Sequence, residues 1–158
     1  MKEIESFELS FGYAQVAVFN SNLIYPFNKW QPQHYAQGFS WRPGSVSFRL
    51  LDEFGLLQVK VQLGGQIESR PDVIRAILVP FSVDPLGIVE IASVDQDGKQ
   101  VQVPEDKYAL VFETGRTNSG IMWCSFTFVP DTHVKARILL ADSDLSPAYP
   151  LLMDAEPA

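Results

Sequence analysis

Hydrophobic and polar residues alternate with a period of two along most of this 158-residue chain. Between Phe7 and Tyr13, apolar side chains occupy every second position, and the same alternation runs from Leu57 to Leu63. Because successive side chains of a strand point to opposite faces of a sheet, this pattern predicts strands with one buried face. Further strands are predicted over residues 16–19, 46–51, 73–83, 88–94, 99–103, 108–114, 121–129 and 134–140.

Turn-forming residues separate these segments. Asp52 to Gly55 is expected to close a hairpin, and Asp95 to Gly98 is a second strong turn signal. Ala14-Gln15 is interpreted as a bulge inside one longer strand that continues to Phe19. Pro80 falls within the run 73–83, and since proline cannot donate to a β-ladder, it should lie at a bulge or an edge. Strands at this spacing are typical of a sandwich or a barrel.

One short helix and an irregular tail complete the prediction. Residues 32–37 begin with a proline, which suits the first helical position. From Ala141 onward there is no periodicity, and the segment carries three prolines, four acidic residues and no basic residue. We expect an all-β fold in which residues 1–140 form a single-domain antiparallel β-sandwich. Residues 141–158 are expected to form an acidic, extended tail, partly disordered at its end.

Composition and charge narrow the class of protein. Hydrophobic residues make up 46% of the chain, which argues against intrinsic disorder. The formal charge of −7 argues against direct nucleic-acid binding, because that needs a basic face to replace phosphate counterions. The acidic N-terminal sequence has no apolar signal region, and no apolar run is long enough to span a bilayer. A cytoplasmic protein that does not contact membranes is therefore expected.

Candidate catalytic and metal-binding residues are few. The single cysteine, Cys124, lies in an apolar run typical of a buried strand. His34 is the one plausible general base, but a loop histidine that bonds to backbone is the stronger interpretation. The segment Asp95-Gln96-Asp97-Gly98 opens like a calcium loop, yet it lacks the third acidic ligand and the distal glutamate. We expect no catalytic residue, no metal and no cofactor, with a hydrolase based on His34 as the weakest alternative.

An aromatic cluster in the loop-like run from Trp30 to Phe48 is the remaining feature. Its aromatic residues either cap one open end of the sandwich or form a protein-contact surface, since Trp and Tyr often anchor interfaces. Acidic turns and the acidic tail are the other surfaces that a basic partner would favour. The candidate partner-binding residues are Trp30, Trp41, Asp95, Asp97, Asp142 and Asp144.

Four sequence blocks, taken in order, resemble the competence protein J family. They are Glu8-Leu9-Ser10 with Tyr13; Trp30, Gly38-Phe39 and Gly44-Ser45-Val46-Ser47-Phe48; Val79-Pro80-Phe81-Ser82-Val83 with Gly87-Ile88; and Pro104, Tyr108 and Leu110. The likeness runs from about Phe7 to Gly115 and fades from Arg116 onward.

The resemblance implies a function, because the known bacterial member of this family inhibits the competence nuclease. It implies a non-enzymatic binding protein whose leading partner is a competence-type DNA-entry nuclease or a related DNA-processing protein. An acidic protein suits the basic active site of such an enzyme. The alternative from a different class is a β-sandwich module that binds calcium or sugar at its loops.

Overall fold

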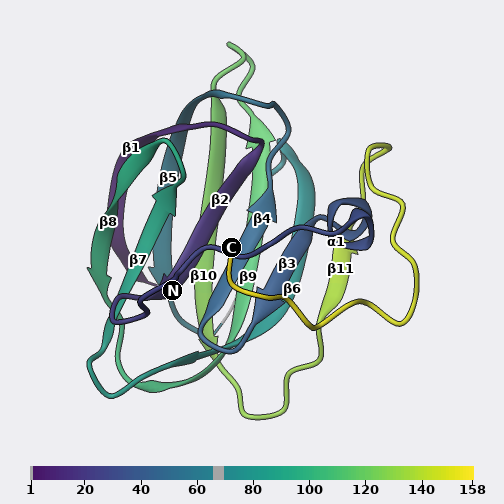
Figure 1. Cartoon of the computed structure of the whole chain (residues 1–158). Coiled ribbons are helices and arrows are strands. Elements are labelled where there is room, and N and C mark those ends of the chain that lie inside the picture. Colours follow the sequence, from purple (N-terminus) through teal and green to yellow (C-terminus); the bar gives the residue numbers. More distant parts are fainter. Residues whose placement is uncertain (1, 66–69) are drawn as a thin grey trace.

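Two β-sheets pack face to face in the computed structural model, which describes residues 2–65 and 70–158 (Figure 1). The larger sheet has the order β1 (Lys2–Phe11), β5 (Gly55–Leu63), β10 (Met122–Pro130), β9 (Asp106–Arg116), β6 (Val73–Val83) and β11 (Arg137–Leu140). The smaller sheet has the order β3 (Phe39–Arg42), β4 (Ser45–Arg49), β2 (Gln15–Asn20), β7 (Ile88–Ser93) and β8 (Gln96–Gln102). Neighbouring strands are antiparallel except β5 and β10, which are parallel. The all-β prediction is confirmed.

The core lies between the inner faces of the two sheets. In β5, Leu57, Val59 and Val61 are buried while the residues between them point outward, as the alternation predicts. Phe48 of β4 stacks on Phe112 of β9 with ring centroids 4.4 Å apart, which joins the sheets at the centre. Burying each such side chain stabilises the fold by about 1.5–3 kcal/mol.

Two predicted local connections are wrong, and both errors have the same cause. Ala14-Gln15 is not a bulge, because Tyr13 and Ala14 form a tight turn, with φ of 56° at both residues, between β1 and β2 of different sheets. The segment around Asp52 likewise carries the chain from β4 to β5 across the sandwich instead of closing a hairpin. Periodicity reports which face of a strand is buried but not the sheet to which that strand belongs.

Other strand bounds differ in detail. β3 lies within the run that sequence alone described as loop-like, and β11 covers only the second half of the predicted strand 134–140. The turn predicted over residues 95–98 consists of residues 94–95, because β7 ends at Ser93 and β8 already begins at Gln96. Pro80 pairs with Ala109 of β9, but β11 extends along β6 only from Ala76 to Leu78. Pro80 therefore lies on a locally open edge, as predicted.

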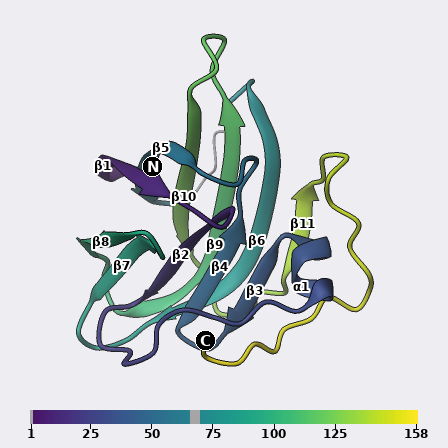
Figure 2. The ribbon, with the colours of Figure 1, turned by 45° about the horizontal axis from the view of Figure 1, so that its top comes forward.

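The helix and the tail lie against each other at one side of the sandwich (Figure 2). Helix α1 (Pro32–Gln37) has the predicted bounds and ends at Gly38, whose φ is 90°. The tail runs back along the helix, and the Ser146 amide donates to the Ala36 carbonyl. The Gln37 side-chain amide donates to the Leu152 carbonyl, and its oxygen accepts from the Leu152 amide. The tail is irregular, as expected, and backbone contacts hold its end: the Lys29 amide donates to the Glu156 carbonyl, and the Ala158 amide donates to the Phe27 carbonyl. Pro157 forms a β-bridge with Asn28, which places the end of the chain in the fold.

Candidate partner-binding surfaces

Trp30 and Trp41 do not form an exposed aromatic patch. Both side chains are half-buried, and each indole nitrogen donates a hydrogen bond within the protein. The Trp30 nitrogen bonds to the Gln15 side chain at 3.1 Å, which ties the loop before α1 to β2. The Trp41 nitrogen bonds to the Pro80 carbonyl at 2.7 Å and so joins β3 to β6 of the opposite sheet. These contacts give both tryptophans a structural role.

The two residues considered for catalysis are held in structural contacts. His34 is 1% exposed, accepts a hydrogen bond from the Gln31 amide at Nδ1, and has Nε2 3.0 Å from the Asp154 carbonyl oxygen. This confirms the interpretation of His34 as a histidine that bonds to backbone. Cys124 is buried in β10, and complete burial raises the pKa of its thiol well above the ordinary value. The thiol is therefore protonated and shielded at neutral pH.

Asp142, in the tail, forms an ion pair with a buried arginine. The Arg75 guanidinium is 0% exposed and meets the two Asp142 carboxylate oxygens at 2.7 and 2.9 Å. Arg75 also donates to the carbonyls of Arg49 and Leu50. Burial alone would raise the pKa of Asp142, but the hydrogen bonds and charge of Arg75 outweigh it and lower that pKa. The ion pair between Asp142 and Arg75 thus fastens the tail to β6, and we call it the clasp. Arg75 already neutralises the charge of Asp142.

The rest of the tail carries less free charge than the sequence indicated. Glu156 lies 3.7 Å from the Lys29 ammonium group. Asp144 and Asp154 are exposed and belong to none of the ion pairs formed within the described residues. Two of the four acidic tail residues therefore retain an uncompensated charge.

Asp95 and Asp97 lie where three loops meet at one end of the sandwich, at the top of Figure 1. We call this surface the three-loop end: residues 12–14 between β1 and β2, residues 52–54 between β4 and β5, and residues 94–97, which form the β7–β8 turn and the start of β8. The Asp95 carboxylate lies over Gly12, so close that a Cβ atom there would be 2.1 Å from its oxygen. The Ala14 amide donates to the Glu53 carbonyl at 2.8 Å. These contacts hold the three loops side by side.

The three-loop end combines apolar and acidic side chains. Tyr13 is 78% exposed, Phe54 is 77% exposed and Val94 is 41% exposed. Glu53, Asp95 and Asp97 are exposed, and none takes part in an ion pair formed within the described residues. Arg116, beside this end, is paired with Asp52 at 2.7 Å. Lys99 follows Asp97 by two residues on β8. Sequence analysis did not identify Tyr13 as a surface residue, because it continues the alternation of apolar positions that is typical of buried core residues.

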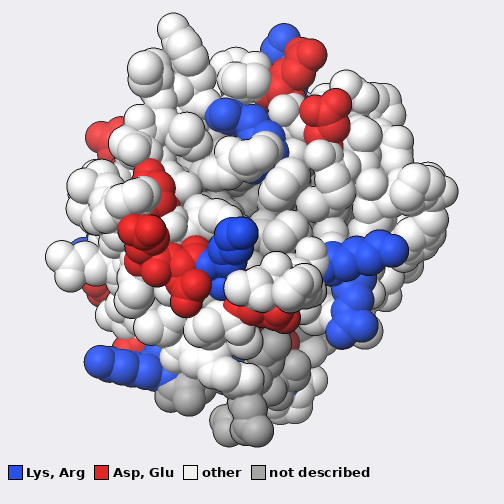
Figure 3. Space-filling model, turned by 90° about the horizontal axis from the view of Figure 1, so that it is seen from below, with Lys and Arg blue, Asp and Glu red and all other residues white. Residues whose placement is uncertain are grey.

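The opposite end of the sandwich is also acidic but more mixed. Glu105 directly precedes β9, which begins at Asp106, and Asp131 donates its amide to the carbonyl of Lys107. Lys135 lies in the loop that follows Asp131. Viewed from this end, acidic and basic side chains lie interspersed over the surface (Figure 3). A partner would meet both signs of charge here.

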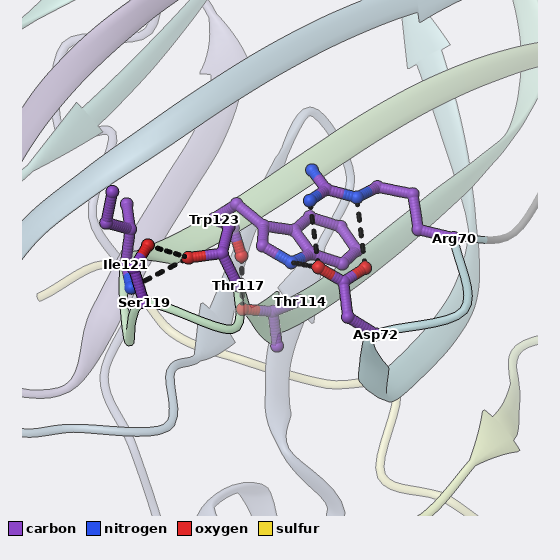
Figure 4. Close-up of polar contacts among 7 residues, drawn as sticks. All are labelled: Arg70, Asp72, Thr114, Thr117, Ser119, Ile121 and Trp123. Atoms are coloured by element: carbon purple, nitrogen blue, oxygen red, sulfur yellow. Dashed lines mark hydrogen bonds and ion pairs between the residues drawn. The ribbon is translucent and has the colours of Figure 1, made fainter.

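The third tryptophan belongs to a polar cluster that closes the outer face of the larger sheet (Figure 4). Trp123 is 2% exposed, its ring lies 3.9 Å beneath the Arg70 guanidinium, and its nitrogen donates to Asp72. Asp72 also accepts two hydrogen bonds from Arg70. Because these groups satisfy one another, the cluster ties the segment that precedes β6 to β10, across the intervening β9.

A cavity of about 750 Å³ lies beside β6, and it does not resemble a calcium or sugar site. Its lining is mostly apolar and comes from β6, the loop 131–137 and the tail, with Lys135 and Arg137 among the lining residues. Within the part of the chain that the structure describes, no group of three or more His, Cys, Asp or Glu side chains could hold a metal ion. Across the same residues, no helix has the length and apolar character needed to cross a bilayer.

Most residues of the four sequence blocks have structural roles. Gly38 takes the left-handed conformation that ends α1, and Gly44, with φ of 82°, makes the β3–β4 turn. The Tyr108 hydroxyl donates to the Pro104 carbonyl at 2.6 Å. The Ser45 hydroxyl donates to the Pro26 carbonyl. Tyr13, by contrast, points its ring into solvent.

The fold and these surfaces define a class: an all-β, two-sheet sandwich with a hydrophobic core, acidic loops and half-buried aromatic residues. Within that class the family is clear, because the family model of competence protein J matches residues 8–129. The chain belongs to the competence protein J family.

Two solved structures share the fold. One is the crystal structure of ComJ from Bacillus subtilis, described as the inhibitor of the DNA-degrading activity of NucA. It is 19% identical, with a TM-score of 0.70, and the match covers 82% of this chain and 98% of that chain. The other, crocagin biosynthetic gene J, is 11% identical, with a TM-score of 0.56 over 84% of this chain and 99% of that chain. No curated protein matches the sequence.

Proposed function

We propose that this protein is a non-enzymatic inhibitor that binds a DNA-degrading nuclease and blocks its active site. The observation that carries the proposal is family membership over residues 8–129, in a family whose Bacillus subtilis member inhibits NucA. The formal charge of −7 supports it, since a cleft that binds phosphodiesters is positively charged. An inhibitor of this kind needs no catalytic residue, and His34 and Cys124 are both held in structural contacts.

The candidate partner-binding residues named from sequence differ in how available they are to a partner. Asp95 and Asp97 are exposed and uncompensated, so both are retained in the proposal. Trp30, Trp41 and Asp142 use their polar groups in contacts within the fold, and they contribute by holding the loops and the tail in place. Asp144 is an exposed acidic group that adds to long-range attraction.

Capture and inhibition together test the proposal. Tagged protein is incubated with lysate of its own cell, bound proteins are identified by mass spectrometry, and the captured nuclease is purified. Degradation of fluorescent double-stranded DNA by that nuclease is then measured against increasing inhibitor. Saturable inhibition is expected, with an association rate that falls as salt rises, because screening shortens to about 8 Å at physiological ionic strength. A protein that captures no nuclease and leaves DNA degradation in the lysate unchanged contradicts the proposal.

A further inference from the structure

We propose that the three-loop end is the surface that docks on the nuclease, with Tyr13 as its apolar anchor and Glu53, Asp95 and Asp97 as its acidic rim. This inference rests on the proposed function and names the contact face. The partner it fits is a basic, phosphate-binding cleft that offers an apolar recess beside its cationic groups.

The first argument is the exposure of large apolar groups. A tyrosine that is 78% exposed and a phenylalanine that is 77% exposed lie on adjoining loops, tied together by the Ala14–Glu53 backbone hydrogen bond. Exposed apolar groups gathered on one surface and rimmed by polar residues mark interaction sites. Tyrosine in particular is enriched among the few residues that dominate binding energy.

The second argument is that the backbone holds Tyr13 in place. Its φ of 56° is a left-handed conformation that costs a residue with a side chain roughly 1–2 kcal/mol. Ala14, in the same conformation, is held by its amide on the Glu53 carbonyl and by its carbonyl, which accepts from the Leu50 amide at 2.6 Å. A side chain presented on a braced loop loses little further freedom on binding, which favours affinity.

The third argument is electrostatic. Asp95 lies over Gly12, beside the anchor, and Glu53 adjoins it through the Ala14 hydrogen bond, while Asp97 follows Asp95 by two residues at the start of β8. None of the three belongs to an ion pair formed within the described residues, and the lysine that follows them on β8 is Lys99. The other acidic surfaces are weaker candidates: Asp142 is neutralised by Arg75, and the opposite end mixes Glu105 and Asp106 with lysines. Charge complementarity to a cationic cleft is therefore strongest at the three-loop end.

Three variants test the inference with the nuclease purified by capture. Tyr13→Asn removes the anchor but keeps a residue that tolerates the left-handed conformation. Asp95→Asn with Asp97→Asn removes two rim charges. Glu105→Gln with Asp106→Asn is the matched control, because it makes the same charge change at the opposite end. Surface plasmon resonance gives both rate constants, DNA degradation gives inhibition, and urea unfolding checks that each variant is folded.

The expected results separate anchor, rim and control. Tyr13→Asn should raise the off-rate at least about tenfold, because it removes a central contact. The Asp95/Asp97 variant should lower the on-rate about three- to tenfold at low salt and much less at high salt. The control should leave both rates within about twofold of wild type.

Three results would overturn the inference, and they can be told apart. If wild type inhibits and the three-loop variants inhibit equally well, the contact face is elsewhere while the proposed function stands. If the Glu105/Asp106 control weakens binding more than the Asp95/Asp97 variant, the opposite end is the contact face. A wild-type protein that does not inhibit the nuclease removes the inference together with the proposed function.

Discussion

The clasp between the tail and β6 gives the sharpest stability prediction. Asp142→Asn removes one charge from a pair in which the Arg75 side chain is 0% exposed and the Asp142 side chain is 14% exposed. Breaking a buried ion pair by removing one partner costs about 3–5 kcal/mol, because the other charge is left without compensation.

Here the cost should be smaller than in a fully buried pair. Arg75 retains the Arg49 carbonyl at 2.7 Å, and asparagine retains one oxygen that can accept from the guanidinium. We therefore expect the free energy of unfolding to fall by about 2–3 kcal/mol, below the range for a fully buried pair. With a urea m-value of about 2–3 kcal/mol/M, the unfolding midpoint should fall by roughly 1 M.

A second ion pair of the same geometry provides the control. Asp52 and Arg116 also form a two-pronged pair, at 2.7 and 2.8 Å, but their side chains are 47% and 36% exposed. Asp52→Asn should cost at most about 1 kcal/mol, as exposed pairs do. Urea unfolding of both variants, followed by tryptophan fluorescence, decides the comparison. If Asp142→Asn costs no more than Asp52→Asn, burial does not control the strength of this clasp and the reasoning is refuted.

Three further predictions follow from the same structure. Because the folded state lowers the pKa of Asp142, the stability from its pair is present above the ordinary carboxyl pKa and is lost as pH falls through the lowered value. The difference between wild type and Asp142→Asn in urea should therefore shrink in acid, and a pH-independent difference would contradict the assignment. Gly38→Ala should destabilise by about 1–2 kcal/mol more than Gly120→Ala, since both sites have positive φ but only a Cβ at Gly38 meets neighbours, at 3.0 and 3.1 Å. Calcium should leave the melting temperature unchanged, since a ligand selective for the native state would raise it, and a saturable rise would favour the ligand-binding alternative.

The sequence by itself determined the local elements of this protein. Helix 32–37 and strand 73–83 have the predicted bounds, because a proline at the first helical position and a long apolar run act on the chain nearby. The alternation in β5 likewise identified Leu57, Val59 and Val61 as core residues. The family resemblance was readable for a similar reason, because its blocks contain residues such as Gly38 and Tyr108 that maintain turns and caps.

Only the tertiary structure decided what the surfaces are. Arg75 and Asp142 are 67 residues apart, and nothing in either neighbourhood indicates that one buries the charge of the other. Tyr13, Glu53 and Asp95 come from three separate turns, and they meet because β1 and β2, like β4 and β5, belong to different sheets. Periodicity records only whether a side chain is buried or exposed within its own strand. Which strands pair, and which loops therefore share an end of the sandwich, depends on contacts between segments far apart in the chain.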